Sequence, residues 1–279
     1  MKSTLCKLLS MLMSSMLFFV FSNCKGCTKT SSHENKIKIG VIAGPENLLW
    51  EKIKEVAKSS HNLDLEIIVF NDYMTPNIAL SDKSIDANAF QHEPFLDNMV
   101  SSRNLALKAV GKTFIFPLTA YSKKISSIKE LKPQAQIAIP NDPTNEGRAL
   151  LLLDNQGLIK LKDPTKLLST PQDIIENPLD LRIIELEAAQ LPRALLDVDI
   201  AIINTTFSKT AGLDPKKEGL FQENNNSYYV NIIAVRSEDA EASWVKKLLE
   251  VVQSDEVMKA ADEIFDGMVL PGWHSGKSQ

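Results

Sequence analysis

The sequence predicts an α/β protein in which mainly parallel sheets are flanked by helices. Short runs rich in Val and Ile alternate along the chain with segments of helical period, as in βαβ units. The strand-like QIAIP leads through a tight turn into a leucine-rich helix, PTNEGRALLLLDN, as a βα connection does. The chain has 279 residues, of which 44% are hydrophobic and 24% charged, and this is enough for one or two domains with ordinary cores.

Each element follows from local periodicity and from Gly, Pro or Asn residues at its ends. The expected strands are 36–42, 65–70, 86–90, 105–110, 114–122, 136–140, 181–187, 199–204 and 228–236. The expected helices are 48–59, 76–81, 93–102, 147–157, 191–196, 243–253 and 256–265. The first of these helices is amphipathic because Leu49, Ile53 and Val56 recur on one face. The leucine-rich helix ends at Gly157.

The N-terminus, residues 1–23, has the pattern of a signal peptide. Two lysines precede the apolar run 8–21, which is shorter than the roughly 20 residues that a membrane-spanning helix needs. Cys24 follows this run in a lipobox-like context and is the expected lipidation site, in preference to Cys27. The alternatives are a buried core helix and the leader of a soluble secreted protein. Residues 24–35, rich in Ser and Thr, are expected to form a flexible tether.

Composition and motifs argue against several functional classes. At most one cysteine remains after Cys24, so a disulfide framework and a cysteine-based metal site are excluded. The formal net charge is −4 and no basic cluster occurs, so nucleic acid is not an expected partner. The patterns HExxH, GxSxG, GxxxxGK[ST] and GxGxxG are absent from the sequence. We therefore expect no enzymatic activity, no catalytic residues, no metal site and no cofactor.

Polar and aromatic residues recur after predicted strands, where open α/β sheets bind their ligands. These residues are Tyr73, Phe90, Gln91, His92, Asn145, Arg148 and Asn204. A capping or surface role is the competing interpretation for each of them alone. Thr144 or Asn145 could cap the leucine-rich helix, and Asn204 could cap the turn after its strand.

Several long segments between residues 36 and 273 match a known family. The longest is IAIPNDPTNEGRALLLLDNQGLIKLKD, and others are FNDYMTPNIAL, DANAFQHEPFL, ENPLDLRIIELEAAQLPRAL and SYYVNIIAVR. In these segments the chain closely resembles the methionine-binding lipoproteins of the MetQ/NlpA family, the substrate-binding components of ABC importers for methionine. The resemblance covers nearly the whole chain after the tether, and its longest motif is far more specific than a lone glycine pattern.

The resemblance implies a two-lobed periplasmic-binding-protein fold, type II-like, with the ligand in the cleft between the lobes. Lobe one is expected to comprise 36–117 plus 231–273, and lobe two 118–230, with a C-terminal tail at 274–279. The chain would then cross a hinge twice, near Phe116–Ala120 and near Tyr229–Asn231.

The same resemblance implies roles for individual residues. Arg148 is expected to pair with the α-carboxylate of the ligand, which a planar guanidinium suits well. Asn204 and Asn231 are expected to bind the amino and carboxylate groups, with Asn145 beside them. An aromatic pocket around the thioether is expected from Tyr73, Phe90 and His92, because sulfur packs favourably on aromatic rings. Gln91 is a second-tier candidate.

The expected protein is a monomer in the bacterial cell envelope, anchored to a membrane by lipid (including palmitate) on Cys24. It would face the periplasm or the cell exterior and deliver methionine, the L-enantiomer, to the permease and ATPase of an ABC transporter. One alternative is the same fold binding D-methionine, another amino acid or a methionine-containing dipeptide. Another alternative is a surface lipoprotein that acts as an adhesin or antigen.

Overall fold

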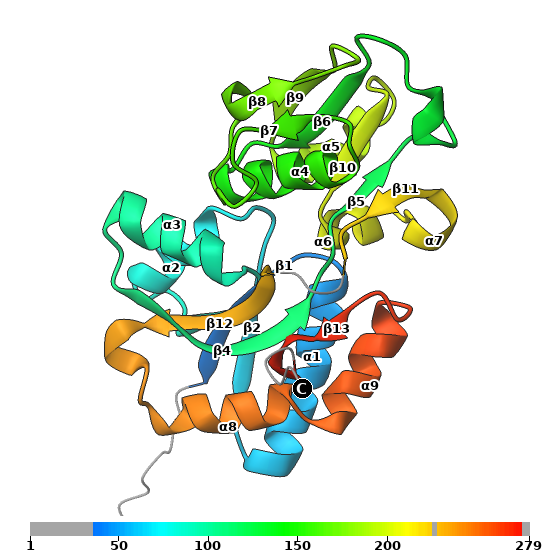
Figure 1. Cartoon of the computed structure of the whole chain (residues 1–279). Helices are drawn as coiled ribbons and strands as arrows, with labels where there is room; N and C mark the ends of the chain where they lie inside the picture. The colour runs from blue at the N-terminus through cyan, green and yellow to red at the C-terminus, as the bar shows by residue number, and fades with distance from the viewer. Residues whose placement is uncertain (1–35, 225–227, 275–279) are drawn as a thin grey trace, which may run out of the picture. The chain divides into compact units, whose positions relative to one another are not determined.

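The structure is a computed structural model that describes residues 36–224 and 228–274. These residues belong to one compact unit with two main sheets (Figure 1). The expected signal peptide, the Cys24 lipidation site and the tether lie outside the described residues, as does most of the expected tail. In the described ranges, no helix is both long enough and apolar enough to cross a membrane.

The first sheet has six strands in the order β13-β4-β12-β3-β1-β2. Its strands are β1 (Ile37–Ile42), β2 (Leu65–Phe70), β3 (Ala87–Asn88), β4 (Leu107–Ile115), β12 (Val230–Arg236) and β13 (Leu270–Pro271). Strand β1 pairs in parallel with β2 and β3, whereas β12 runs antiparallel to both β3 and β4. The chain therefore leaves this sheet after β4 and returns through β12, which lies between β3 and β4.

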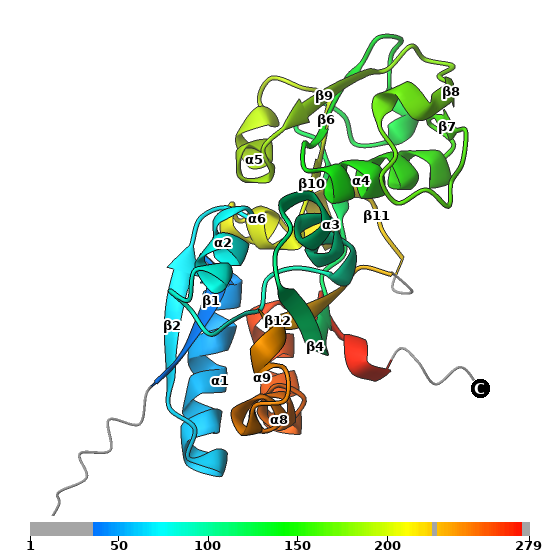
Figure 2. The same ribbon diagram turned by 90° about the vertical axis from the view of Figure 1, so that its left-hand side faces the viewer.

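Helices cover both faces of the first sheet (Figures 1 and 2). They are α1 (Pro45–His61), α8 (Ser243–Val252) and α9 (Asp255–Ile264) on one face, and α2 (Thr75–Ser81) and α3 (Glu93–Arg103) on the other. Successive side chains of a strand point to opposite faces of the sheet, so neighbouring residues of β12 pack against different helices. Ile233 and Val235 pack in the core beneath α1 and α8, whereas Ile232 and Ala234 pack with α2 and α3.

The second sheet has five strands in the order β11-β5-β10-β6-β9. Its strands are β5 (Thr119–Tyr121), β6 (Gln136–Pro140), β9 (Arg182–Leu186), β10 (Ile200–Ile203) and β11 (Gly219–Gln222). Strand β6 is parallel to β9 and β10, and β5 is antiparallel to β10 and β11. Helix α4 (Pro143–Asn155) packs on Ile137 and Ile139, while α5 (Leu191–Ala194) packs on Ala138 from the other face.

The remaining elements are short. They are β7 (Lys160–Leu161), β8 (Ile174–Glu176), α6 (Thr205–Thr210), α7 (Pro215–Glu218) and the 3₁₀ turns at Ile128–Glu130, Pro171–Asp173, Ala188–Gln190, Ser237–Asp239 and Gly272–His274. Helix α6 matters most for the site, because it follows β10 directly and contacts α1. A buried apolar cluster includes Ile42 and Phe90 beside the first sheet together with Tyr121, Ile203 and Phe207 from the second sheet and α6.

Two expectations need correction. The sheets are mixed rather than mainly parallel, because β12, β13 and β5 are reversed relative to the neighbouring strands. Parallel pairing needs a crossover on one face of the sheet, whereas β5 and β12 enter their sheets from the other sheet without one. The strands expected at 105–110 and 114–122 also differ, since β4 runs without a break through residues 107–115 and the second begins only at Thr119.

Candidate functional site

A small cavity, partly open to solvent, lies among the loops that follow β2, β3, β6 and β10. All seven residues predicted to bind ligand line it, and Gln91 does as well. The strand-end argument therefore selected side chains that the fold brings together, although they are spread over more than a hundred positions of the chain.

One wall of the cavity is aromatic. The ring of Tyr73 stacks on Phe90 with centroids 5.8 Å apart, and it meets Phe95 edge-on at 6.2 Å. Phe207 of α6 closes against Tyr73 at 5.1 Å from the other side. Such a wall suits an apolar, polarisable group, because a thioether sulfur packs favourably against ring edges.

A second part of the lining, the amide wall, includes Asn145, Asn204 and Asn231. The Oδ1 atom of Asn145 accepts a hydrogen bond from Nδ2 of Asn204 at 3.0 Å and lies 3.3 Å from Nε2 of His92. Its Nδ2 donates to both carboxylate oxygens of Asp142 at 3.0 and 3.1 Å. Asn231 is placed by a hydrogen bond of 3.1 Å from its Nδ2 to the carbonyl of Phe90, and its backbone pairs with that of His92. Hydrogen bonds within the protein thus hold these amides in place.

The competing capping interpretation does not hold for Asn145. Helix α4 begins at Pro143, earlier than the predicted 147, and its N-cap is Asp142, whose carboxylate accepts from the backbone N–H of Asn145. Asn204 occupies the N-cap position of α6, but its side chain makes no capping hydrogen bond and instead binds Asn145. Among the described residues, no group pairs with the buried Oδ1 of Asn204. A ligand donor would satisfy this acceptor, since an unpaired buried acceptor is costly.

Arg148 is the one charged residue among the cavity's described lining residues. Its side chain is only 3% exposed, and its guanidinium lies over the ring of Tyr229, 4.4 Å from the centroid. Its Nη2 donates to the carbonyl of Phe116 at 2.9 Å and to the carboxylate of Glu223 at 2.5 Å. The predicted carboxylate-binding residue is therefore held rigidly and already has one protein carboxylate as its partner.

His92 is buried and uncharged near neutral pH. Burial, and secondarily the charge of Arg148, lower the pKa of its imidazole to about 3. Its Nδ1 accepts from the backbone N–H of Phe95 at 3.1 Å and caps α3, so the proton of the neutral ring is on Nε2, facing Asn145. His92 thus lines the cavity and caps helix α3. Because its Nδ1 lone pair accepts the capping hydrogen bond, this atom is not available as a general base.

Gln91 belongs to a buried amide network. Its Nε2 donates to Oδ1 of Asn77 at 2.7 Å and to Oδ1 of Asn88 at 2.8 Å, and its Oε1 accepts from Asn77 at 2.8 Å. The amide protons of Gln91 are therefore used within the protein. The network fixes the segment after β3, which carries both Phe90 and His92.

Helices α1 and α6 meet at a buried carboxyl group. The side chain of Glu46, in the first turn of α1, accepts a hydrogen bond from the hydroxyl of Thr206, a lining residue of the cavity. Burial raises the pKa of Glu46 from its ordinary value of 4.5 to about 8, although the bond from Thr206 opposes this shift. At neutral pH the folded state therefore holds this group mostly in its protonated form.

This raised pKa predicts a pH-dependent stability. Between about pH 4.5 and pH 8 the folded state binds more protons than the unfolded state, so the free energy of unfolding should fall as pH rises through this range. Glu46→Gln should reduce the decline between pH 6.5 and pH 8.5, as measured by urea denaturation, while Glu146, whose pKa burial raises to about 7, still contributes in the lower part of this range. The lowered pKa of His92 acts only below about 6.5, the ordinary value for histidine, and does not interfere in that window. The matched variant Glu51→Gln, on the exposed side of α1, should keep the wild-type slope, and a Glu46→Gln slope equal to that of wild type would contradict the prediction.

Sequence reasoning missed several residues at the site. They are Phe95, Phe116, Thr205 and Thr206 on the cavity lining, Phe207 behind Tyr73, and Tyr229 and Glu223 around Arg148. Phe95 could have been found from the sequence. It lies three positions after His92, so an N-cap at His92 would place it beside that residue in the first turn of the helix. Glu223 carried none, since nothing in its local sequence indicates a partner 75 positions away.

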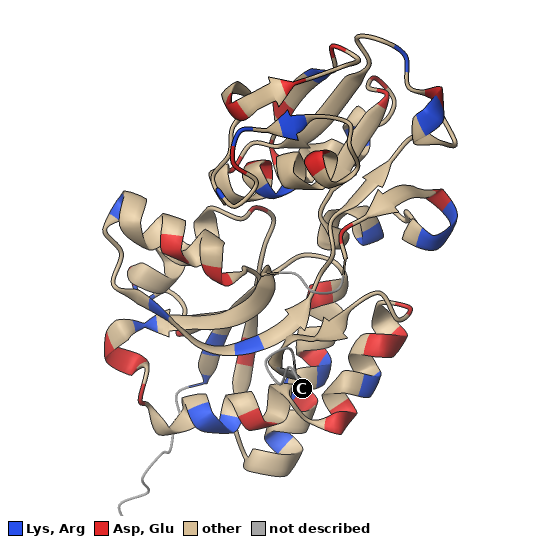
Figure 3. Cartoon of the chain, in the orientation of Figure 1, with Lys and Arg blue, Asp and Glu red and all other residues tan. Residues whose placement is uncertain are grey.

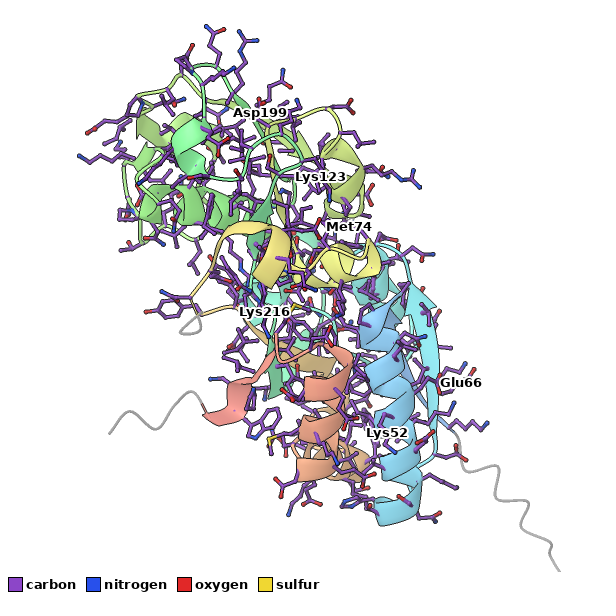
Figure 4. The ribbon with its side chains drawn as sticks, turned by 90° about the vertical axis from the view of Figure 1, so that its right-hand side faces the viewer. Lys52, Glu66, Met74, Lys123, Asp199 and Lys216 are labelled. Carbon is purple, nitrogen blue, oxygen red and sulfur yellow. The ribbon has the colours of Figure 1, made fainter. Side chains whose placement is uncertain are left out.

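No group of three or more metal-ligating side chains that could hold an ion occurs in the part of the chain that the structure describes. Acidic and basic residues are interspersed over the helices (Figure 3), and charged side chains such as those of Lys52 and Glu66 lie on the outside of their elements (Figure 4). The cavity is therefore chemically distinct from the surface, with one buried cation, several amides and an aromatic wall.

Comparison with known proteins relates the chain to one family along most of its length. Residues 37–273 match the family model described as NlpA lipoprotein. The protein called probable D-methionine-binding lipoprotein MetQ, from Vibrio cholerae, is 52% identical over 248 residues, which cover 89% of this chain and 92% of that protein.

Solved structures show the same relationship. A crystal structure of the methionine-binding protein MetQ matches with a TM-score of 0.83 and 51% identity, covering 86% of this chain and 98% of the other. A nutrient-binding protein from Burkholderia cenocepacia, solved bound to methionine, matches with a TM-score of 0.83 and 46% identity, covering 85% and 99% of the two chains.

Proposed function

Because the chain belongs to the NlpA lipoprotein family, we propose that it binds methionine in the cavity described above and delivers it to an ABC importer. The observation that carries this proposal is the division of one cavity into an aromatic wall and an amide wall with a single guanidinium. Free methionine is divided in the same way, into a thioether side chain and a zwitterionic head.

The polar wall offers a partner for each charged group of an amino acid. Arg148 provides hydrogen-bond donors and a positive charge for the α-carboxylate. Asn204 provides an acceptor, its Oδ1, for the α-ammonium group. Asn145 and Asn231, which lie beside these two groups, supply further amide contacts.

The aromatic wall sets the side-chain preference. Tyr73, Phe90 and Phe95 form a cluster of rings that a flexible, unbranched thioether can fill. No charged side chain among the described lining residues faces a ligand side chain from this wall. Charged amino acids should therefore bind poorly, because their side chains would lose water without gaining a partner.

We also propose that the two sheets are the cores of two lobes that close around the ligand. Lobe one would comprise 36–117 plus 231–273 and lobe two 118–230. Tyr73, Phe90 and His92 lie on the first lobe in this division, whereas Arg148 and Asn204 lie on the second. A ligand that contacts both sets favours the closed arrangement.

The remaining parts of the proposal concern the setting of the protein. Several relatives carry the word lipoprotein in their names, which supports lipid attachment at Cys24 and a location in the bacterial cell envelope. A structural relative is called the periplasmic substrate-binding protein of an ABC transporter, which supports a permease and ATPase as partners and a binding role rather than an enzymatic one. We expect the protein to act as a monomer.

The enantiomer is the part of the proposal that most needs a direct test. The relative from Vibrio cholerae is named for D-methionine, whereas our expectation from the sequence is L-methionine. A thermal-shift panel of both enantiomers, the other amino acids and methionine-containing dipeptides should give its largest increase in melting temperature with L-methionine. Equal melting temperatures across the panel would contradict methionine binding and favour a surface role as adhesin or antigen.

Two substitutions of His92 should separate its two roles. His92→Ala removes both the ring and the cap of α3, and it should lower the free energy of unfolding by about 1 kcal/mol as well as weakening methionine binding. His92→Asn keeps a capping oxygen and should retain most of the stability while still weakening binding, because the ring is lost from the wall. Urea denaturation and calorimetry measure the two effects. Wild-type affinity in both variants would remove His92 from the site.

A further inference from the structure

Glu223 occupies one edge of the Arg148 guanidinium. Nε of Arg148 lies 3.1 and 3.2 Å from the two carboxylate oxygens, and Nη2 donates to one of them at 2.5 Å. The side chains of Arg148 and Glu223 are only 3% and 14% exposed, so this ion pair is largely shielded from water and salt. It is a two-pronged pair of the kind that fixes the plane of a guanidinium.

Glu223 is itself anchored at the segment that joins the two sheets. Its backbone N–H donates to the carbonyl of Leu118 at 2.9 Å, and its carboxylate accepts from the N–H of Leu118 at 3.3 Å. Phe116, in the same segment, supplies the carbonyl that accepts from Arg148. The carboxylate of Glu223 therefore cannot move away from Arg148 without disturbing the connection between β4 and β5.

The charges around the cavity do not sum to a positive site. Arg148 is the single cation on the described lining, and Glu223 neutralises it. Asp142 adds a second carboxylate at the N-cap of α4, where it binds Asn145, although burial raises its pKa. His92 is neutral and contributes no charge.

We propose that Glu223 is a specificity-determining residue that makes the site select for ligands of zero net charge. This inference rests on the proposed function of the cavity as an amino-acid site. An uncompensated guanidinium would attract any carboxylate, whether or not an ammonium group accompanied it. With Glu223 in place, a carboxylate gains less at Arg148, and a ligand needs its ammonium group at Asn204 to bind well. Glu223 thus has two effects: it orients Arg148, and it weakens the binding of ligands with a net negative charge, such as N-acylated amino acids.

The test compares two ligands in three proteins by isothermal titration calorimetry. The ligands are L-methionine, which is a zwitterion, and N-acetyl-L-methionine, which is an anion. The proteins are wild type, Glu223→Gln, and the control Glu241→Gln, which makes the same charge change at an exposed position. In Glu223→Gln the affinity ratio of the two ligands should shift toward the anion by about tenfold, the size expected for one partly shielded charge. An unchanged ratio, or an equal shift in the control, would overturn the inference.

A second measurement does not depend on the folding of Glu223→Gln. In the wild-type protein, N-acetyl-L-methionine and the cationic L-methionine methyl ester should both bind more weakly than L-methionine. N-acetyl-L-methionine binding as tightly as L-methionine would overturn the role of Glu223. Failure of the wild type to bind methionine would instead overturn the proposed function and this inference with it, so the two failures are distinguishable.

Discussion

Arg148→Ala is expected to weaken methionine binding by about 100-fold or more, the largest single effect at the site. The guanidinium is buried, is the single cation on the described lining, and is held by Glu223, Tyr229 and the carbonyl of Phe116. Without it, the carboxylate of the ligand would enter a cavity with no positive charge to offset its loss of water. Isothermal titration calorimetry measures the affinity directly.

The same substitution leaves Glu223 without its cation, so stability must be measured alongside binding. We expect Arg148→Ala to lower the free energy of unfolding by about 1–3 kcal/mol, and titration at low temperature keeps the variant folded. Arg193→Ala, at an exposed position of α5, provides a matched control that should leave both quantities unchanged. Wild-type affinity in a folded Arg148→Ala variant would exclude Arg148 as the carboxylate partner.

Gly147→Ala is expected to cause a large loss of stability although it adds only one methyl group. Gly147 lies in α4, where alanine is normally the better helix former by about 1 kcal/mol. Here an added Cβ would overlap the backbone carbonyl of Leu167 and come within 3.0 Å of the backbone N of Ser169. Backbone atoms cannot swing aside as a side chain can, so we expect a loss of about 2–3 kcal/mol in the free energy of unfolding.

Urea denaturation of Gly147→Ala and Asn155→Ala tests this expectation within one helix. Asn155 is the exposed last residue of α4, and its replacement should change the free energy of unfolding by less than about 0.5 kcal/mol. A Gly147→Ala variant as stable as wild type would show that the segment around Leu167 can move away from α4. Methionine affinity should also fall in this variant, because Arg148 is the next residue of the helix.

The sequence predicted the elements that bear the site better than it predicted how the sheets are arranged. Strands β6 and β10 are marked by largely apolar runs, because they are buried on both faces, and β1 ends in such a run. The strands β11 and β13 are too short for periodicity to reveal them, and the direction of β5, which lies within the strand expected at 114–122, could not be predicted from the sequence. The start of α4 was predicted four residues too late, although Asp142 followed by Pro143 is a typical N-cap and first-turn pair.

The residues of the candidate site that directly follow a strand could be predicted from the sequence. Those that reach the site only through pairing between distant segments could not. Tyr73 and Phe90 follow strands of the first sheet, and Asn145 and Asn204 follow strands of the second, so position after a strand was enough to select them. Glu223 and Tyr229 reach Arg148 only because β11 and β12 bring the chain back beside α4. The resemblance to a known family supplied the roles of these residues, whereas the structure supplied their partners.

A crystal structure of the protein with L-methionine tests the central claim most directly. We predict that the ligand lies in the cavity with its carboxylate on the guanidinium of Arg148, its ammonium on Oδ1 of Asn204 and its thioether against Tyr73 and Phe90. A cavity without the amino acid at saturating concentration, or a ligand whose carboxylate lies away from Arg148, would contradict it.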